Sequence, residues 1–487
     1  MSHYQGILKK ALKNKVLHYI FSRYATYFIQ FINSLFIAVY LGPYYLGIWG
    51  FITLIIQYLN QINLGIAHSV NAIIAIHKNK EWYAQKVIGT SLTMLAGLSI
   101  LVILFFAGNE LFNLDIGSKY NFSTYAPVVA AIGVLGYFNS LFSNIFRVYG
   151  KVIEIAINQS AFPVLMLVAI VFFKGENLLW ALVGANLIAY LLSLILFLIK
   201  TPVKLNPIFI SRLVKTIQIK GWHLFVYNTS FYLIIISTKT FVSAYYSVEE
   251  FGYFTFAFAL ANVVLLLLQS FSFLIFPKLI NRLASATSDK AQELLEMIRK
   301  VYISTSHLLI HFAILLFPLF ILFFPQYNQS SDAFRTIALT VVLYTNSFGY
   351  SGLLIAKGLE KKLGYLSLFA LIINVISAYI VVEIFQVRFA YVIIATMVTY
   401  FIYVFFLGYL GRKKLDLNSS FLSVFNDLYP VSLLIPFIVS WVLIITSVPN
   451  LYFIIPISLF IIMNWKDFFK IKEMINKVFL NPDFINI

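Results

Sequence analysis

Cysteine is absent from the 487 residues of this chain. Its absence excludes disulfide bonds, thiol catalysis, and zinc or iron–sulfur sites built on cysteine ligands. Phosphate-binding glycine loops and nucleophile–base constellations are also missing, and His307 and His311, four residues apart, have no acidic residue beside them. We therefore expect no catalysis, no cofactor and no metal site.

Charged side chains are scarce too, at 11% of the residues, whereas 61% are hydrophobic. Apolar runs of about 20 residues can cross a bilayer as helices, and none of the segments between them is long enough for a soluble domain. The fold class expected is an all-α polytopic membrane protein with about 14 transmembrane helices. The expected spans are 19–41, 45–66, 86–107, 123–146, 152–173, 178–199, 222–245, 252–276, 301–324, 333–356, 363–384, 389–411, 428–447 and 451–465.

The 35 Lys and Arg residues alternate between crowded and nearly empty loops along this series. Because cationic loops stay in the cytoplasm, the alternation predicts a topology with both termini inside. On that topology 29 cations are cytoplasmic and four lie outside, namely Lys119, Lys174, Arg335 and Arg388. Spread over many short loops, the cations favour contact with anionic lipids over nucleic-acid binding. We predict a bacterial cytoplasmic (inner) membrane protein.

Residues 200–220 contain two prolines and five cations and form the clearest internal boundary. A short self-similarity, with Gly47 aligned on Gly252, indicates two six-helix lobes of the same orientation. The organisation predicted is an N-lobe at 1–199, a cytoplasmic inter-lobe linker at 200–220, a C-lobe at 221–412, and two further spans with an amphipathic tail at 413–487. The lobes are expected to be related by a pseudo-twofold axis around a central cavity.

Two segments outside the spans have a helical amphipathic pattern. Residues 281–300 carry an apolar stripe beside several charges, and the tail after Trp465 has the same character. Both are expected to lie along the inner membrane surface.

Polar residues inside the spans gather on four helices. Since polar side chains are costly in lipid, such stripes are expected to face a bundle interior or a wet cavity. For a single Asn or Gln, hydrogen bonding between helices is the simpler interpretation, but the stripes together predict a substrate cavity. The residues predicted to line it are Arg23, Tyr27, Gln30, Asn33, Gln57, Asn60, Gln61, Asn228, Tyr232, Lys239, Asn262 and Gln269.

Arg23 and Lys239 are the two cations placed within spans. Two placements of each charged group are left open. It can lie in the cavity, or the side chain can extend along its helix to the lipid headgroups on its own side. The sequence places no carboxylate near either one. A cavity with unpaired cations suits an anion, and a guanidinium suits phosphate through paired hydrogen bonds.

Local motifs then point to a family. A basic start precedes the early Arg23, Leu41 to Gly50 reads Leu-Gly-x-x-x-x-Gly-x-x-Gly, and Asn63-Leu-Gly-Ile-Ala-His-Ser closes the second span. Together with the span count, these features resemble the polysaccharide flippases (Wzx-type, O-antigen and capsule exporters) of the multidrug/oligosaccharidyl-lipid/polysaccharide (MOP) superfamily.

The resemblance implies a transporter that moves an undecaprenyl-pyrophosphate-linked oligosaccharide from the cytoplasmic to the outer leaflet by alternating access. It also implies membrane lipids, a polysaccharide polymerase and chain-length proteins as partners. Multidrug members of the superfamily couple to ions through carboxylates, and no Asp or Glu lies in the middle of a span here. The alternatives left open are a drug or solute antiporter of the same fold and a membrane polysaccharide polymerase or glycosyltransferase.

Overall fold

The computed structural model describes residues 15–77, 80–112, 114 and 116–467, with side chains except at 15–23, 220, 265–278 and 281. Within these ranges the chain is helical and has no strand, so the all-α prediction is confirmed. The chain divides into two compact units, Met1–Phe225 and Val226–Ile487. Each is described by itself.

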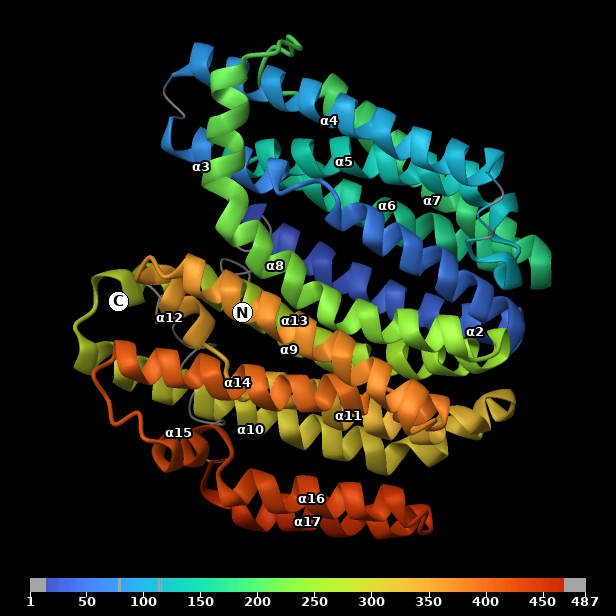
Figure 1. The fold of residues 1–487 in the computed structure, drawn as a ribbon, viewed down its shortest axis with the longest axis vertical. Helices are drawn as coiled ribbons and strands as arrows, with labels where there is room; N and C mark the ends of the chain where they lie inside the picture. The colour runs from blue at the N-terminus through green and yellow to red at the C-terminus, as the bar shows by residue number, and fades with distance from the viewer. Residues whose placement is uncertain (1–14, 78–79, 113, 115, 468–487) are drawn as a thin grey trace, which may run out of the picture. The chain divides into compact units, whose positions relative to one another are not determined.

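Unit 1 is built from long apolar helices connected mostly by short turns (Figure 1). Its helices are α2 (Lys15–Gln61), α3 (Ile66–Ile76), α4 (Glu81–Leu111), α5 (Ala126–Val148), α6 (Val152–Phe172), α7 (Gly175–Ile199) and the first part of α8 (Ser211–Tyr245). Two short 3₁₀ turns, Ser118–Tyr120 and Phe122–Thr124, lie between α4 and α5.

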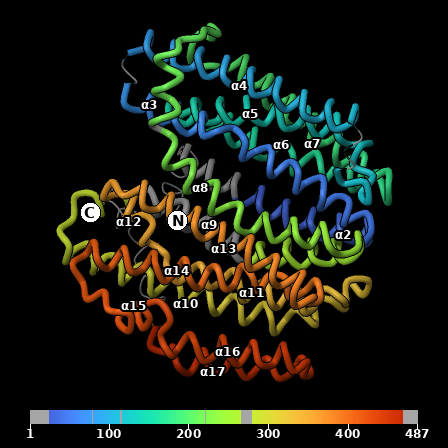
Figure 2. The backbone as a smooth tube through the Cα atoms, in the orientation of Figure 1, coloured from blue at the N-terminus to red at the C-terminus, as the bar shows by residue number. Residues whose placement is uncertain are grey.

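Helix α2 consists of two arms that meet at Gly42. This glycine has φ 68° and ψ 173°, and Pro43 follows it. Glycine adopts positive φ without a steric penalty, and proline cannot continue a helix, so the pair reverses the chain. The ribbon folds back on itself there (Figures 1 and 2). The break falls between the first two expected spans.

Unit 2 continues with α8 and contains the rest of the helices. These are α9 (Val248–Ser285), α10 (Ser288–Ile321), α11 (Ser331–Thr345), α12 (Tyr350–Ala356), α13 (Glu360–Tyr379), α14 (Ile394–Lys414), α15 (Phe421–Leu428), α16 (Val431–Ile445) and α17 (Ile454–Met463). A π turn at Ile380–Ile384 extends α13, and 3₁₀ turns at Pro325–Ser330, Phe389–Tyr391 and Asn450–Phe453 join neighbouring helices. Ser247 caps α9 by accepting a hydrogen bond from the backbone N–H of Glu250, whose side chain bonds back.

The expected surface helix at 281–300 is not a separate element. Helix α9 ends at Ser285, and α10 begins at Ser288 and runs without a break to Ile321. Leu295 and Ile298 belong to the apolar stripe that was expected to face the membrane surface, and both are buried in the protein. The amphipathic pattern therefore reflects the packed first turns of a spanning helix. The tail predicted to be amphipathic lies outside the described residues from 468 onward.

The predicted linker at 200–220 is only partly irregular, because its second half belongs to helix α8. Residues 201–210 are irregular, but 211–220 form the first turns of α8, which continues to Tyr245. The irregular part crosses α4, where Ile208 donates its backbone N–H to the carbonyl of Gly89 (3.3 Å) and accepts a hydrogen bond from the Thr93 hydroxyl (3.2 Å).

Membrane-spanning helices are abundant in the described part of the chain. Nine helices there are long and apolar enough to cross a bilayer, or ten if the bent pair α15–α16 counts as one span. Tyr24–Gln61 is one of the nine although it breaks at Gly42. The multi-pass prediction is confirmed, and the number fourteen stays a prediction.

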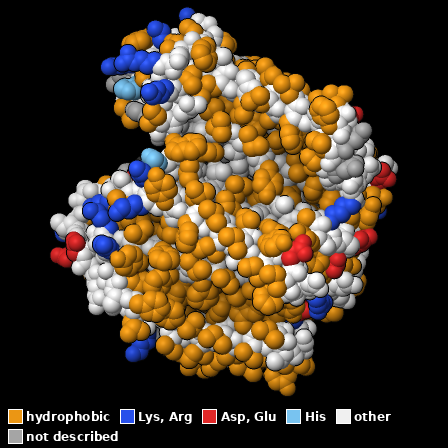
Figure 3. Space-filling view, viewed as in Figure 1, with side chains coloured by type: hydrophobic (Ala, Val, Ile, Leu, Met, Phe, Trp, Pro, Cys, Tyr) orange, Lys and Arg blue, Asp and Glu red, His pale blue; other side chains and the backbone are white. Residues whose placement is uncertain are grey.

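Charge is separated along the helices of each unit. Figure 3 shows Lys and Arg side chains gathered at the end of unit 1 near α3 and the start of α4, and at the end of unit 2 near α12 and α15. Most of the acidic side chains visible on the same face lie at the opposite ends, where a few Lys or Arg side chains also lie. The loop alternation predicts such a bias, and the cytoplasmic placement of the cationic ends stays a prediction.

Single cysteines introduced into this Cys-free chain test the sidedness. We expect Lys204→Cys and Lys290→Cys, both at exposed positions, to resist a membrane-impermeant thiol reagent in intact cells and to react after permeabilisation. Glu110→Cys, exposed at the end of α4, is the matched control that should react in intact cells. Labelling of position 204 or 290 without permeabilisation would contradict the topology.

Candidate functional site

In unit 1, Asn33 holds two helices together. It is 1% exposed, and its amide nitrogen donates a hydrogen bond to the carbonyl of Pro163 in α6 at 2.7 Å. Its oxygen is buried and finds no hydrogen-bond partner in the part of the chain described. Tyr27 and Gln30, predicted to share its face, are half-buried. In this structure Asn33 fastens α2 to α6.

Asn60 belongs to an amide network that crosses unit 1. Its side chain hydrogen-bonds with Tyr190 of α7, whose carbonyl accepts from the amide of Asn139 in α5 at 2.9 Å. Asn158 of α6 donates to the oxygen of Asn139 at 3.1 Å. The neighbouring Gln57 and Gln61 are half-buried. Four helices therefore meet around polar groups at one end of α2.

The chain leaves helical geometry immediately after this network. Asn63 donates its side-chain amide to the carbonyl of Asn60 (2.8 Å) and accepts from the backbone N–H of Gly65 (2.9 Å). Gly65 has φ 70°, and a Cβ added there would meet Phe225 at 2.7 Å. The Asn-Leu-Gly motif singled out in the sequence thus makes a joint between α2 and α3.

In unit 2, the predicted residues of α8 lie along one face. Asn228 is exposed, Tyr232 is 40% exposed, and Lys239 is half-buried with its Nζ 3.8 Å from the centre of the Phe258 ring. Asn262 donates to the carbonyl of Phe258, at 3.0 Å. Among the described residues no carboxylate lies within ion-pair distance of Lys239. Arg23 and Gln269 lie outside the described side chains.

A buried polar seam lies beside Lys239. The amide nitrogen of Asn374 in α13 is 2.8 Å from the carbonyl of Ile234 and 2.8 Å from the hydroxyl of Ser237. The hydroxyls of Thr238 and Thr396 are 2.6 Å apart and join α8 to α14. These contacts fix the helix that carries Lys239, so that its ammonium is held against an aromatic ring.

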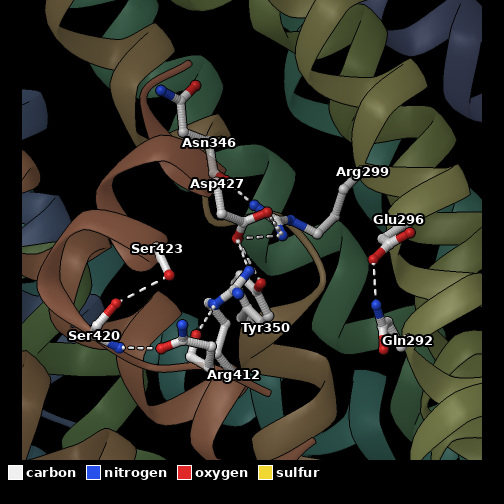
Figure 4. Close-up of polar contacts among 10 residues, drawn as sticks. Gln292, Glu296, Arg299, Asn346, Tyr350, Arg412, Ser420, Ser423 and Asp427 are labelled. Carbon is white, nitrogen blue, oxygen red and sulfur yellow. Dashed lines mark hydrogen bonds and ion pairs between the residues drawn. The ribbon is translucent and has the colours of Figure 1, made fainter.

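Unit 2 also contains a buried ion pair that was not predicted from the sequence. The guanidinium of Arg299, 4% exposed in α10, donates two hydrogen bonds to Asp427 of α15 at 2.9 and 3.2 Å (Figure 4). Tyr350 donates its hydroxyl to the same carboxylate at 2.6 Å, and Arg412 of α14 lies 3.9 Å from it. A second guanidinium nitrogen of Arg299 donates to the carbonyl of Asn346 (3.0 Å).

We call these residues the Asp427 cluster (Arg299, Asn346, Tyr350, Arg412 and Asp427). Their contacts hold the turn between α11 and α12 in place. Gly349 in that turn has φ 86°, and its missing side chain makes room for Leu295 and Arg299. A cavity of about 340 Å³ opens beside the cluster. Arg299 and Asp427 are 128 residues apart, so no local spacing could have revealed the pair.

The hairpin of α16 and α17 is held to the rest of unit 2 at three levels. Lys300 pairs with Asp467 at 2.8 Å at one end. At the middle, the side chains of His311 and Ser440 are 3.3 Å apart, and Phe460 packs on the rings of His307 and His311.

At the other end of the hairpin, the guanidinium of Arg335 in α11 donates to Asn450 and lies over the Phe453 ring. Arg335 was counted with the outside cations at the edge of the expected span 333–356, and the structure places it 7% exposed within a helix. In the described residues no group of three or more His, Asp or Glu side chains is arranged to hold a metal ion.

Comparison with known proteins identifies the family. Residues 12–281, more than half of the chain, match the family model described as polysaccharide biosynthesis protein. The chain belongs to this family. No curated protein sequence matches the chain.

Solved structures of two kinds share the fold of this polysaccharide biosynthesis protein. An inward-facing multidrug resistance MATE family transporter of the MOP superfamily has a TM-score of 0.69 at 16% identity, covering 80% of this chain and 94% of that one. The lipid II flippase MurJ in an inward closed conformation has a TM-score of 0.65 at 14% identity, covering 96% and 100%. MATE in a bent conformation gives 0.57 at 17% identity, covering 84% and 95%.

The identities to these structures are low, so they show the fold. The fold expected from the resemblance to the MOP superfamily is confirmed, and the transporter role stays a prediction. The chain is a multi-pass membrane protein of polysaccharide biosynthesis with a fold shared by a flippase and by drug transporters. Its substrate follows from neither comparison.

Proposed function

We propose that this protein is a flippase that moves an undecaprenyl-pyrophosphate-linked oligosaccharide, the repeat unit of an O-antigen, capsule or related polysaccharide. Transport runs from the cytoplasmic to the outer leaflet of a bacterial inner membrane by alternating access. The observation that carries the proposal is membership of a polysaccharide biosynthesis family in a chain whose fold covers the whole of a lipid II flippase structure.

The charge of Lys239 supports an anionic cargo. Its ammonium lies 3.8 Å from the centre of the Phe258 ring, and no acidic residue of the described chain pairs with it. A ring face attracts a cation but does not neutralise its charge. A pyrophosphate brought beside it would supply the missing counter-charge, and desolvation would strengthen that attraction.

Arg23 supplies the second predicted cation, near the cytoplasmic end of the first span. Lys239 lies near the other end of its span by the same topology, six residues before the end of α8. In this proposal Arg23 receives the headgroup on the cytoplasmic side and Lys239 releases it on the outer side. Tyr27, Gln30, Gln57, Asn60, Gln61, Asn228, Tyr232, Asn262 and Gln269 serve the sugar hydroxyls or the packing around them.

The MATE likeness favours one alternative, a drug or solute antiporter of the same fold. The two functions differ in the charge they require. A cationic drug needs a carboxylate in the transport path, whereas the predicted path here contains Arg23 and Lys239 and no acidic residue. The family description also favours a polysaccharide precursor over a drug.

Complementation of a strain that lacks the gene tests the proposal. We expect the wild-type chain to restore surface polysaccharide, Arg23→Ala to abolish it at normal protein levels, and Arg23→Lys to restore it only partly, because an ammonium lacks the guanidinium fork. Lys239→Ala should reduce export. Lys361→Ala, at an exposed lysine of α13, is the matched control and should export normally. Full export by an Arg23→Ala, Lys239→Ala double variant would overturn the anionic mechanism.

A further inference from the structure

Unit 2 gathers a cluster of aromatic rings around Phe231 of α8. The Phe231 ring centre lies 4.9 Å from that of Tyr344 in α11, 5.3 Å from Tyr403 and 6.0 Å from Tyr400, both in α14. Tyr344 and Tyr400 are also in contact, at 6.1 Å. These separations are those of favourable ring pairs, so the cluster is a rigid aromatic surface.

The inner rings of the cluster form a base and the outer ones remain accessible. Tyr400 and Tyr403 are 3% and 1% exposed, whereas Tyr344 is 41% exposed. Tyr227, one helical turn before Phe231, hydrogen-bonds with Tyr403 and with Ser351 of α12. The accessible surface is therefore formed by Tyr344 and the half-buried Phe231, with their backs against a fixed support.

The depth of this surface argues against contact with lipid tails. Tyr344 lies thirteen residues from the start of α11, and Phe231 lies fourteen residues from the end of α8, about 20 Å in each case at the rise of an α-helix. Tyrosines that anchor a protein to headgroups lie at the membrane boundaries instead. An exposed phenol at mid-depth needs water or a polar ligand.

Polar neighbours of Phe231 on α8 strengthen that conclusion. Asn228 is exposed one turn before Phe231, and Tyr232 is 40% exposed beside it. An exposed amide in hydrocarbon would be costly, so this face of α8 borders a hydrated space. Aromatic faces flanked by amide and hydroxyl groups offer both an apolar plane and hydrogen-bonding partners.

A sugar ring has matching chemistry. Its C–H groups make one face apolar and slightly positive, which suits the negative face of an aromatic ring, while its hydroxyls lie around the edge. We propose that Phe231 and Tyr344 form a stacking platform for a sugar ring of the transported oligosaccharide, with Asn228 and Tyr232 receiving its hydroxyls. The proposal rests on the proposed function and names the part of the cargo that this surface binds.

Binding measurements with two lipids distinguish recognition of the glycan from recognition of the pyrophosphate headgroup. Full-length protein is purified and its affinity is measured for undecaprenyl pyrophosphate and for the undecaprenyl-pyrophosphate-linked oligosaccharide extracted from the source strain. We expect Tyr344→Leu and Phe231→Leu each to weaken binding of the glycosylated lipid by about three- to tenfold and to leave the bare lipid unaffected. Tyr344→Phe, which keeps the ring, should bind both lipids like the wild type.

The controls fix the interpretation. Phe369→Leu replaces an aromatic side chain of α13 that is 51% exposed and lies outside the cluster, and it should change neither affinity. The platform is overturned if Tyr344→Leu weakens binding of both lipids equally, or if it binds the glycosylated lipid like the wild type. It is also overturned if Tyr344→Phe loses as much affinity as Tyr344→Leu. If the wild-type protein binds neither lipid, the proposed function fails and the platform fails with it.

Discussion

Replacing Asp427 with alanine should destabilise the protein by about 3–5 kcal/mol, because it leaves a buried guanidinium without its counter-charge. Arg299 is 4% exposed and has no second carboxylate within ion-pair distance among the described residues. Tyr350 loses its acceptor in the same change. The measurement is the thermal unfolding midpoint of full-length protein in detergent, together with its steady-state level in the membrane.

Asp467→Ala is the matched control for this prediction. Asp467 also pairs with a cation of α10, but its partner Lys300 has a side chain that is 50% exposed. Solvent screens such a pair, whose contribution is about 0–1 kcal/mol. Asp427→Asn should fall between the two, since its amide can still accept from Tyr350. Equal midpoints for the two alanine variants would show that the Asp427 cluster is not the stabilising feature inferred here.

Replacing Gly89 with alanine should also destabilise the protein, although alanine is the better helix former. A Cβ at this position of α4 would lie 2.1 Å from the backbone oxygen of Asn206. The clash must push residues 206–208 off the helix and break the hydrogen bonds of Ile208 to Gly89 and Thr93. We expect a loss of about 1–3 kcal/mol, as for other overpacked sites.

A second glycine of α4 provides the control, for which we expect the opposite change in stability. Gly97, eight residues further along α4, has nothing within 4 Å of its Cβ position. Gly97→Ala should therefore stabilise the protein by up to about 1 kcal/mol through helix propensity alone. The measurement is the thermal unfolding midpoint. If both variants raise it or both lower it, the segment after α7 does not pack against Gly89.

The helices and their ends could be predicted from the sequence because these features are local. Gly42 and Pro43 mark the reversal in α2, and clusters of Lys and Arg mark one end of each unit. Length and hydropathy decide whether a helix can span a membrane, and both are properties of a single segment. The same logic failed at 281–300, where an amphipathic stripe faces protein rather than headgroups.

Side-chain partners could not be predicted in the same way. Asn33 and Pro163 are 130 residues apart, and Arg299 and Asp427 are 128 apart. A single sequence shows that such residues are polar within apolar helices, but it does not show which helix packs against which. Lys239 was identified as a candidate because it lies in a span, whereas Arg299 and Arg335 were counted with the cations outside the spans and so were not considered.

The attachment of the last helices, α15 to α17, to earlier parts of unit 2 has a consequence for biosynthesis. A ribosome makes α10 and α11 well before α15, so Arg299 enters the membrane before Asp427, 128 residues later, has been translated. Arg335 likewise precedes Asn450 by 115 residues. Until the last helices arrive, Arg299 lacks its only carboxylate partner among the described residues and Arg335 lacks its Asn450 partner, so water, headgroups or the insertion machinery must take their place. Docking of α15 to α17 is thus the step that completes unit 2, and a chain released before residue 427 carries an unfinished helix bundle for quality control to recognise.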